Sequence, residues 1–481
     1  MREPADFAAL RAGLSGDATA FYDQSTGRSW SFSQTNATAE ALAADLSRYG
    51  RGARIAHLAF NRAESFITLF AAQKAGQIFV PLNWRAPVEE LRGQIARTSP
   101  SAVVCDASHA PRARELFAEV RVMAAEGGFA DLAPQPGFTA APAAADAPLA
   151  LLFTSGSSGT PRAVIQTAAM AQAVAVNIAQ GLGLLGSDRS VCYLPLCHTG
   201  GINLVTLPLF LWGGQSHILP KYDAGVLADL VQGGEVTQLF AVPTVWQDLH
   251  DQGAATLTAL AKLRGCASGG APFPEGLARS LQAAGVVVQN GYGMTESGPT
   301  GFLADRATAL RDPVSVGRPQ IYTRARIAGT PMGELQMQGA TITPGYYEDP
   351  IATTEAFTPD GWLKTGDLAQ RDADGCYRII GRVKEMYISG GENVWPAEVE
   401  AVLQAHPRVR EAAVIAVPDP RWGEAGLAFV IATGPQPTAE ELTGFCRDRL
   451  TAFKVPRAFR FVTDLPRSPA GKIRKSALAA L

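Results

Sequence analysis

The chain has 481 residues, 47% of them hydrophobic and 18% charged, and its formal net charge is −2. This length exceeds what one hydrophobic core supports, so two or more domains are expected, and the composition excludes a disordered or fibrous protein. Because the charge is nearly balanced and no run of Lys or Arg occurs, the sequence also argues against a nucleic-acid partner.

The cysteines and the apolar runs bear on the cellular compartment. Six cysteines are scattered without a CxxC spacing, which favours reduced thiols over a disulfide framework or a zinc site. The opening residues, MREPADFAAL, carry no apolar stretch behind a basic end, and the longest apolar run, GINLVTLPLFLW, is short and contains a proline. We therefore predict a cytoplasmic protein with no membrane insertion. The oligomeric state stays open, with a homodimer as one alternative.

Up to Asp106, patterns typical of helices alternate with patterns typical of buried strands. The expected helices are 38–50, 63–76 and 88–98, and the expected strands are 53–60, 78–82 and 102–106. A stretch rich in Ala, Pro and Gly at 124–148 then predicts a surface connection. The alternation returns later, with strands expected at 191–196, 216–219, 238–242 and 286–293. This βαβ winding predicts parallel sheets with helices on their faces.

After Gly381 the pattern changes to short strands and two helices, at 396–406 and 438–450. This length suits one small α+β domain. We therefore predict an N-terminal domain over residues 1–381 and a C-terminal domain over residues 382–481.

The segment LLFTSGSSGTPRAVIQT, residues 151–167, places a loop rich in Gly and Ser after a buried-strand pattern. Glycines let a backbone approach a ligand closely, and the amides of such a loop can form a nest for an anion. The hydroxyls and the guanidinium of Arg162 add donors, which suits a chain of phosphates. The segment differs from the nucleoside-triphosphatase loop, because no Gly-Lys-Ser/Thr follows at the required spacing.

Five motifs occur in this order: TSGSSGTPR, GYGMTE, LKTGD, GRVKEMYISGGENVWPAEVE and SPAGKIRK. Together they closely resemble the adenylate-forming superfamily, which comprises acyl- and aryl-CoA ligases, adenylation domains of nonribosomal peptide synthetases and firefly-type luciferases. The resemblance covers nearly the whole chain, from about Ser29 to the end. It implies an α/β fold with a large N-terminal domain of two βαβ-type subdomains plus a β-barrel, and a small, mobile α+β lid domain at the C-terminus.

The resemblance also implies a reaction in two steps. ATP and a carboxylic acid give an acyl-adenylate and pyrophosphate, and the thiol of coenzyme A then displaces AMP. Glu296, with Thr295 beside it, would hold Mg²⁺, which neutralises the triphosphate. The residues that match the family's phosphate loop are Thr154, Ser155, Gly156, Ser157, Ser158, Gly159, Thr160 and Arg162.

Other motif residues would surround the nucleoside. Asp367 would accept hydrogen bonds from both ribose hydroxyls, with Arg382 in support. Tyr292 would offer an aromatic face to the adenine. The remaining residues expected at the adenosine are Gly269, Gly270, Ala271, Asn290 and Gly291.

The lid would serve both half-reactions. Lys472 would reach in from the C-terminal domain and offset negative charge in the adenylation transition state. We expect Lys475 to be a solvated residue of the chain's tail, and a solvated tail residue stays open as an alternative for Arg474. In the family the lid then rotates about a hinge residue that matches Lys384. The residues expected to line the tunnel for the pantetheine arm are Ser389, Gly390 and Gly391.

Two segments depart from the family pattern. The phosphate loop ends in Pro161-Arg162-Ala163 where Pro-Lys-Gly is usual, and Leu363 replaces a common aromatic residue. The arginine keeps the positive charge, so neither change removes an essential group.

The residues expected to line the acyl pocket are mostly small and apolar, and the glycines among them are expected to leave room for a flat ring or an unbranched chain. Asn290-Gly291 stands where ligases for malonate-like diacids carry an arginine, and the segment FAVP has no acidic neighbour for an amino-acid ammonium. We therefore predict an aromatic (cinnamate- or ferulate-like) or medium-chain monocarboxylic acid as substrate. His198 would shape the pocket or serve a structural role. The expected lining is His198, Gly200, Gly201, Ile202, Asn203, Val242, Gly269 and Pro299.

Three alternatives to this function stay open. The acyl group could be loaded onto the pantetheine of a carrier protein, although the chain has no appended carrier domain, which favours free CoA. The substrate could also be of the o-succinylbenzoate type. A luciferase-like oxygenase is the third, and oxygen uptake would distinguish it.

Overall fold

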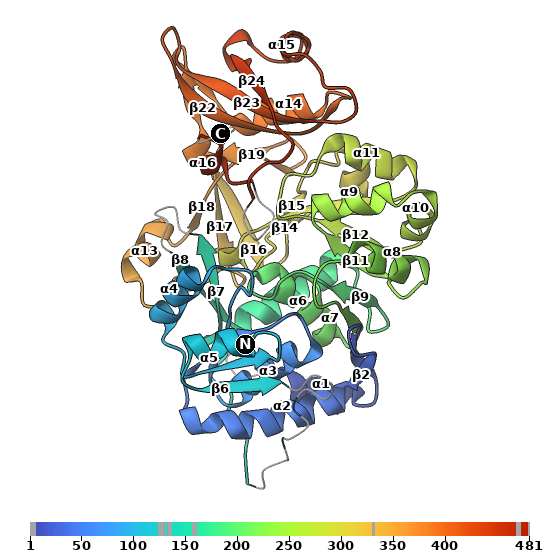
Figure 1. The fold of residues 1–481 in the computed structure, drawn as a ribbon, viewed down its shortest axis with the longest axis vertical. Coiled ribbons are helices and arrows are strands. Elements are labelled where there is room, and N and C mark those ends of the chain that lie inside the picture. Colours follow the sequence, from blue (N-terminus) through green and yellow to red (C-terminus); the bar gives the residue numbers. More distant parts are fainter. Residues whose placement is uncertain are drawn as a thin grey trace.

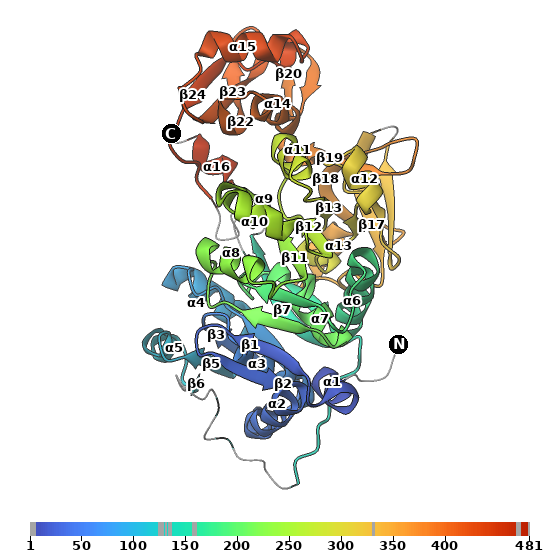
Figure 2. The ribbon, with the colours of Figure 1, turned by 90° about the vertical axis from the view of Figure 1, so that its right-hand side faces the viewer.

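Figure 1 shows a computed structural model of the chain, which describes residues 6–123, 129, 132, 137–155, 161–329, 332–467 and 473–479. Most of the chain forms a large lower part, and C-terminal residues form a smaller part above it, as the view turned by 90° also shows (Figure 2). The predicted α/β class is confirmed. Within the described ranges, no helix is both long and apolar enough to cross a membrane.

A six-stranded sheet of order β6-β5-β3-β4-β7-β8 belongs to the large part, and every neighbouring pair is parallel except β7 with β8. All residues of β5 are buried, which explains its apolar run up to Asp106, and every residue of α3 is buried as well. The elements predicted up to Asp106 are confirmed, although α2 starts earlier than residue 38 because Ser31 and Gln34 form a capping box. The strands are β3 (Arg54–Leu58), β4 (Ile78–Pro81), β5 (Ala102–Asp106), β6 (Val120–Met123), β7 (Pro148–Ser155) and β8 (Pro161–Thr167), and the helices are α2 (Phe32–Leu46), α3 (Ala63–Lys74), α4 (Val88–Thr98) and α5 (Ala110–Leu116).

The strands predicted between 191 and 293 exist, but they divide between two sheets of order β2-β1-β10-β9 and β11-β12-β13-β14-β15. The two sheets meet at β9 and β11, where Thr237 N donates a hydrogen bond to Arg189 O. Further along, a side chain bridges the two strands instead of backbone hydrogen bonds, because the Tyr193 hydroxyl donates to Phe240 O. The strands are β1 (Thr19–Asp23), β2 (Arg28–Ser31), β9 (Arg189–Cys192), β10 (Gln215–Ile218), β11 (Gln238–Ala241), β12 (Gly265–Ser268), β13 (Val288–Tyr292), β14 (Phe302–Leu303) and β15 (Arg318–Pro319). The helices are α1 (Phe7–Ser15), α6 (Ala168–Leu182), α7 (Thr206–Trp212), α8 (Ala224–Gln232), α9 (Pro243–Asp251), α10 (Ala254–Leu260), α11 (Glu275–Ala283) and α12 (Arg306–Arg311).

An antiparallel sheet of order β16-β17-β18-β19 completes the large part. Its strands lie between the parallel sheets and the upper part (Figure 1). The strands are β16 (Thr323–Ala328), β17 (Met332–Gly339), β18 (Leu363–Arg371) and β19 (Tyr377–Arg382), and α13 (Pro350–Ala356) precedes β18.

The upper part is built on a sheet of order β21-β20-β23-β22, with β24 paired to β23. The two predicted helices are confirmed as α14 and α15, but β22 and β23 span 11 and 10 residues and are longer than the expected short strands. The short helix α16 is a further element that lies on the side facing the large part (Figures 1 and 2). The elements are η4 (Val383–Glu385), β20 (Tyr387–Ser389), β21 (Glu392–Val394), α14 (Pro396–Gln404), β22 (Val409–Asp419), β23 (Gly423–Ala432), α15 (Ala439–Arg447), η5 (Ala452–Lys454), β24 (Ala458–Phe461) and α16 (Lys475–Leu478).

Candidate active site

The carboxylate of Asp367, on β18, lies between an aromatic and a cationic side chain. The Tyr292 hydroxyl, from β13, donates a 2.6 Å hydrogen bond to Asp367 Oδ2, and Arg382 Nε of β19 lies 3.0 Å from Oδ1. Asp367 is 6% exposed. Burial, together with the negative charge of Asp367, raises the pKa of the Tyr292 hydroxyl well above its ordinary value. The tyrosine therefore stays a neutral donor at this carboxylate.

The glycines predicted at the adenosine lie side by side at the ends of β12 and β13, where Ser268 pairs with Asn290. A Cβ atom on Gly269 would lie 3.1 Å from Gly291 O and 3.3 Å from the Phe240 ring. Side chains at this point would separate the two segments, so the glycines permit the close approach. Gly270, with φ +83°, and Ala271 continue the same segment at the surface.

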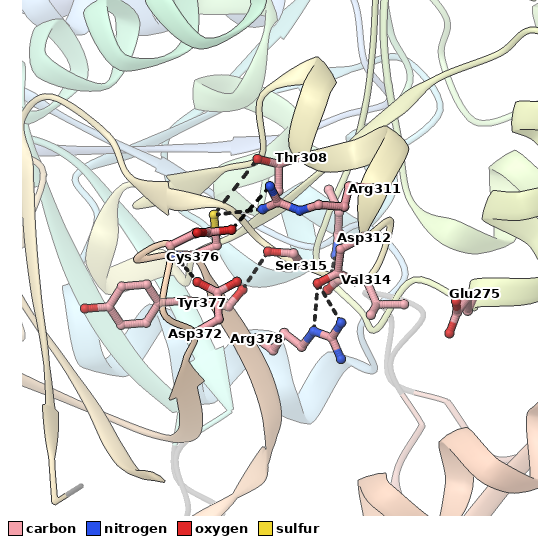
Figure 3. A network of polar contacts seen from close by, with 12 residues as sticks. Glu275, Thr308, Arg311, Asp312, Val314, Ser315, Asp372, Cys376, Tyr377 and Arg378 are labelled. Carbon is pink, nitrogen blue, oxygen red and sulfur yellow. Dashed lines mark hydrogen bonds and ion pairs between the residues drawn. The ribbon is translucent and has the colours of Figure 1, made fainter. Parts of the chain in front are cut away.

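The side-chain amide of Asn290 is bound within the fold. Its Nδ2 donates a 3.1 Å hydrogen bond to Val314 O. Close to Val314 in the chain, Asp312 Oδ2 accepts a 2.8 Å hydrogen bond from Arg378 Nε of β19. This pair belongs to a polar network that joins the segment containing Asp312 and Val314 to β19 (Figure 3). Because β19 ends at Arg382, the network connects the residues around Asn290 to the strand whose Arg382 forms the ion pair with Asp367.

Glu296, in the short helix η3 (Thr295–Ser297), is held by two residues of the segment 343–346. The Tyr346 hydroxyl donates a 2.9 Å hydrogen bond to Glu296 Oε1, and Thr343 N donates to Glu296 O at 2.9 Å. The Arg162 guanidinium lies over the Tyr346 ring, with Cζ 5.3 Å from the centroid. Burial, together with the Glu296 charge, raises the pKa of Tyr346, so its hydroxyl remains a donor at neutral pH. The structure thus brings Glu296 and Arg162 together around one tyrosine.

The donor set at Glu296 fits a magnesium ion. Mg²⁺ prefers oxygen ligands and is usually bound through one or two carboxylates together with substrate phosphates. Glu296 is 5% exposed, and the Thr295 hydroxyl is next to it in the chain. Among the residues that the structure describes, no group of three or more His, Cys, Asp or Glu side chains could hold a metal. The ion would therefore need phosphate oxygens to complete its shell.

The predicted phosphate loop is described at its two ends. Thr154 pairs with Arg162, and Ser155 pairs with Pro161, in the antiparallel pair β7–β8. Gly156, Ser157, Ser158, Gly159 and Thr160 lie outside the described residues. The hairpin geometry therefore connects this loop directly to the strand that carries Arg162.

The predicted acyl pocket contains the π-helical turn η2 (Gly200–Leu204), which follows the half-buried His198. A Cβ atom on Gly201 would overlap Pro195 O and lie 2.7 Å from Leu194 O. The expectation that the pocket glycines leave room for a substrate is therefore wrong for Gly201, because backbone atoms fill that space. Within η2, Ile202 is buried at 3% exposure.

A cavity of about 10 Å³ lies between η2 and the neighbouring strands. Gly200, Gly201, Leu204 and Phe240 are among its lining residues, and all of its lining side chains are uncharged.

Two further pocket residues lie closer to the nucleotide segments. Val242 Cγ1 would be 3.7 Å from a Cβ on Gly270, and Pro299 is buried, with its carbonyl against Gly293.

The predicted hinge and tunnel residues are in the upper part of the molecule. Lys384 is exposed in η4, and Ser389 ends β20. Gly390 has φ +61°, and a Cβ atom there would overlap the Trp422 ring, whose backbone carbonyl accepts a 2.8 Å hydrogen bond from Gly390 N. Gly391 has φ +87° and faces open space. The first glycine therefore packs against an indole, whereas the second is unobstructed.

Lys472 lies outside the described residues. The next lysine in the chain, Lys475, forms ion pairs with two carboxylates. Lys475 Nζ lies 2.7 Å from Glu385 Oε2 and 2.8 Å from Glu400 Oε1, and its side chain is 20% exposed. The prediction of a solvated Lys475 is therefore wrong, because two carboxylates from η4 and α14 enclose its ammonium group. Arg474 is exposed, in agreement with the open alternative.

Two side chains that contact Thr295 or Glu296 were not predicted. Tyr346 donates to Glu296, and Gln166 Nε2 donates a 2.9 Å hydrogen bond to Thr295 O. The sequence signal for Gln166 is a polar residue directly after the apolar run 163–165, in the strand next to the phosphate loop. Tyr346 lies in the segment GYYE, which belongs to none of the five motifs. Its contact with Glu296 joins segments that are far apart in the sequence.

Comparison with known proteins agrees with this geometry. Residues 9–347 match the AMP-binding enzyme family, and residues 398–472 match the AMP-binding enzyme C-terminal domain. Feruloyl-CoA synthase of Amycolatopsis sp is 37% identical over 435 residues, which cover 88% of each chain. Indoleacetate–CoA ligase of Aromatoleum aromaticum is 31% identical and covers 93% of this chain and 92% of its own.

Solved structures show the same architecture. The o-succinylbenzoate CoA synthetase of Bacillus subtilis, in complex with an acyl-adenylate intermediate, has a TM-score of 0.90 and 27% identity over 99% of this chain and 98% of its own. The same synthetase in complex with ATP and a magnesium ion has a TM-score of 0.88 and 26% identity over the full length of both chains. The chain thus belongs to the AMP-binding enzyme family, within the adenylate-forming superfamily. It is an ATP-dependent, AMP-forming acid–CoA ligase.

Proposed function

We propose that this ligase activates an aromatic (cinnamate- or ferulate-like) or medium-chain monocarboxylic acid and transfers the acyl group to coenzyme A. The observation that carries the proposal is the uncharged lining of the cavity beside η2, which includes Leu204 and Phe240. An apolar acyl tail gains about 0.8 kcal/mol per buried methylene in such a lining. The lining would have to open to admit a ring or chain, because the cavity is only about 10 Å³.

A second carboxylate on the acid would be poorly served. Asn290 stands where a diacid ligase is expected to have a cation, and its amide is already bound to Val314 O. An unpaired carboxylate buried there would cost roughly several kcal/mol. The acids named for two of the relatives, feruloyl and indoleacetate, are aromatic and support the same class.

The roles proposed for the site follow from its contacts. Asp367 would bind the ribose hydroxyls between Tyr292 and Arg382. Mg²⁺ held by Glu296 and Thr295 would neutralise charge on the triphosphate. The phosphates would contact the predicted loop, residues 154–160, with Arg162, and the adenine would lie against Gly269, Gly270, Ala271, Asn290, Gly291 and Tyr292.

The C-terminal part would act in both steps. We assign residues 1–381 to the adenylation domain and 382–481 to the lid. Lys472 would stabilise the charge that develops on the acid and the α-phosphate. After rotation about Lys384, the segment 389–391 would border the pantetheine arm.

A panel of acids tests the substrate class. Pyrophosphate release and acyl-CoA formation are measured with saturating ATP, Mg²⁺ and CoA for ferulate, cinnamate, octanoate, malonate, 2-succinylbenzoate and amino acids. We expect kcat/KM to be highest for the cinnamates or octanoate. A preference for malonate would contradict the pocket assignment, and a preference for 2-succinylbenzoate would favour the function named for the Bacillus subtilis structure. Replacing CoA by a phosphopantetheinyl carrier protein tests the acceptor.

A further inference from the structure

The side chain of Gln166 connects two parts of the active site that are far apart in the sequence. Its Nε2 donates a 2.9 Å hydrogen bond to Thr295 O, and its Oε1 accepts a 3.3 Å hydrogen bond from Asn203 Nδ2. Thr295 belongs to the segment assigned to the metal, and Asn203 to the segment assigned to the acid. Gln166 is 3% exposed, so the amide has exchanged water for these two partners.

At the metal end, the hydrogen bond fixes the peptide that precedes Glu296. The following carbonyl, Glu296 O, accepts from Thr343 N at 2.9 Å, and the carboxylate accepts from the Tyr346 hydroxyl at 2.9 Å. Thr295 O also accepts a 3.2 Å hydrogen bond from Gly298 N, so loss of the Gln166 contact would loosen this peptide without releasing it. The glutamine supplies the side-chain contact to Thr295 O, and it acts together with Gly298, Thr343 and Tyr346 in holding the Glu296 segment.

At the acyl end, the partner lies in an unusual piece of backbone. Asn203 is part of the π-helical turn η2, and its Nδ2 also donates to Thr199 Oγ1 at 3.1 Å. Both residues are buried, at 5% and 7% exposure. Single π-turns are rare and are frequently found at functional sites. Because Gly200, Gly201 and Leu204 of η2 line the small cavity, an acid that opens this cavity would move the turn and Asn203 with it.

The strand β8, which carries Gln166, also acts on Glu296 through a second residue, Arg162. Arg162 and Gln166 are four residues apart on β8 and so point to the same side of the strand. Arg162 lies over Tyr346, which binds Glu296, whereas Gln166 binds the peptide before it. The strand that follows the phosphate loop thus holds Glu296 from two directions, and one of them leads on to the acyl pocket.

We propose that Gln166 is a positioning residue that couples occupancy of the acyl pocket to binding of magnesium-ATP. Displacement of η2 by the acid acts on Gln166 through Asn203, and Gln166 acts on the Thr295 peptide. The coupling is reciprocal, so magnesium-ATP also tightens binding of the acid. This inference rests on the roles proposed above for Glu296 and for the acyl pocket.

Calorimetric titration of the full-length enzyme with α,β-methylene ATP and Mg²⁺ tests the proposal. The bond broken in adenylation is blocked in this analogue, so binding is measured with and without saturating ferulate and without turnover. In the unchanged enzyme we expect ferulate to tighten binding of the analogue by about fivefold or more. Gln166→Leu should weaken binding without ferulate by about fivefold, the effect of one neutral hydrogen bond, and should abolish the ferulate effect.

Two further variants separate coupling from general damage. Asn203→Leu cuts the connection at its acyl end and should abolish the ferulate effect, and titration of this variant with ferulate alone establishes that the acid still binds. Gln77→Leu is the matched control. Gln77 is 1% exposed and donates to Leu46 O and Gly50 O, remote from the site. This control should retain both the affinity and the ferulate effect.

The outcomes distinguish the inference from the proposed function. A ferulate effect that is absent from the unchanged enzyme, or intact in Gln166→Leu or in Asn203→Leu, overturns the coupling. Analogue binding that is unchanged in Glu296→Gln contradicts the metal role proposed for Glu296 instead. Melting temperatures of Gln166→Leu and Gln77→Leu that agree within a few degrees exclude loss of fold as the cause of any difference.

Discussion

Replacing Lys475 by methionine should destabilise the C-terminal part of the protein. The ammonium group of Lys475 is within 2.8 Å of carboxylate oxygens from both Glu385 and Glu400, whose side chains are 35% and 15% exposed. Methionine keeps the length and most of the apolar contact of the stem, but it leaves two carboxylates facing each other. Removing one partner from a buried ion pair costs about 3–5 kcal/mol. Because Glu385 is partly exposed, water screens some of this repulsion, and we expect the lower end, about 3 kcal/mol.

Urea unfolding followed by tryptophan fluorescence measures this loss, since Trp395 and Trp422 report on the C-terminal part. The matched control is Lys454→Met. Lys454 Nζ lies 2.7 and 2.8 Å from the two carboxylate oxygens of Glu398, and its side chain is 19% exposed. This ion pair differs from that of Lys475 because it involves a single carboxylate, and the Glu398 side chain is 39% exposed. The control should lose about 1 kcal/mol or less. Equal losses in the two variants would contradict the conclusion that the second carboxylate makes Lys475 more important for stability than Lys454.

The pH dependence supplies a second check. Burial lowers the pKa of Lys475, but Glu400 and Glu385 outweigh burial, so the pKa is raised above 10.5. Its stabilising contribution is therefore present at pH 7 and is lost only as the pH rises above that value. Burial raises the pKa of Glu400 despite the lysine, and removal of the lysine raises it further. A carboxyl group whose folded pKa is raised regains stability as the pH falls, so the loss in Lys475→Met should be smaller at pH 5 than at pH 7. A loss that grows on acidification would contradict this assignment.

Three further predictions concern the reaction and the lid. Lys472→Ala should slow adenylate formation by orders of magnitude but spare thioester formation from a supplied acyl-adenylate, and equal losses in the two half-reactions would contradict its role. Tyr346→Phe removes the hydrogen bond to Glu296 and should raise the KM for magnesium-ATP about fivefold in a steady-state assay, whereas an unchanged KM would separate Tyr346 from the metal site. Gly390→Ala should lower the free energy of unfolding by about 1–3 kcal/mol in urea titration, because the residue has a positive φ and its Cβ would overlap the Trp422 ring. A stability equal to that of the unchanged protein would show that the indole moves aside.

The elements that could be predicted from the sequence are those whose apolar pattern is local. The buried strand β5 is a short apolar run that ends at Asp106, and the helix α3 has an apolar segment, residues 66–72, that is interrupted at Thr68. Both elements occur where they are expected. The motif residues Tyr292, Asp367 and Arg382 also come together as the resemblance implies. Local pattern cannot, however, show which distant segment supplies a partner.

Lys475 illustrates that limit. A basic residue near the end of a chain is typical of a solvated tail, but its partner Glu385 is 90 residues away in the sequence. Gly201 illustrates a second limit, since a glycine that leaves space and a glycine that lets two backbone segments touch are identical in sequence. The packing against Leu194 and Pro195 decides between them. Gln166 joins segments that are 37 and 129 residues away, so its contacts could not be predicted from periodicity.

The contacts of Asp367 have a consequence for the choice of nucleotide sugar. Each carboxylate oxygen offers about two lone-pair directions, and one on each oxygen is taken, by Tyr292 on Oδ2 and by Arg382 on Oδ1. In its proposed role, Asp367 has one remaining direction for each of the two vicinal hydroxyls of a ribose. A 2′-deoxyribose would fill only one, and the other acceptor would lose its water without a partner. The site should therefore discriminate against deoxyadenosine triphosphate by about tenfold or more, through an aspartate that is already oriented before any nucleotide binds.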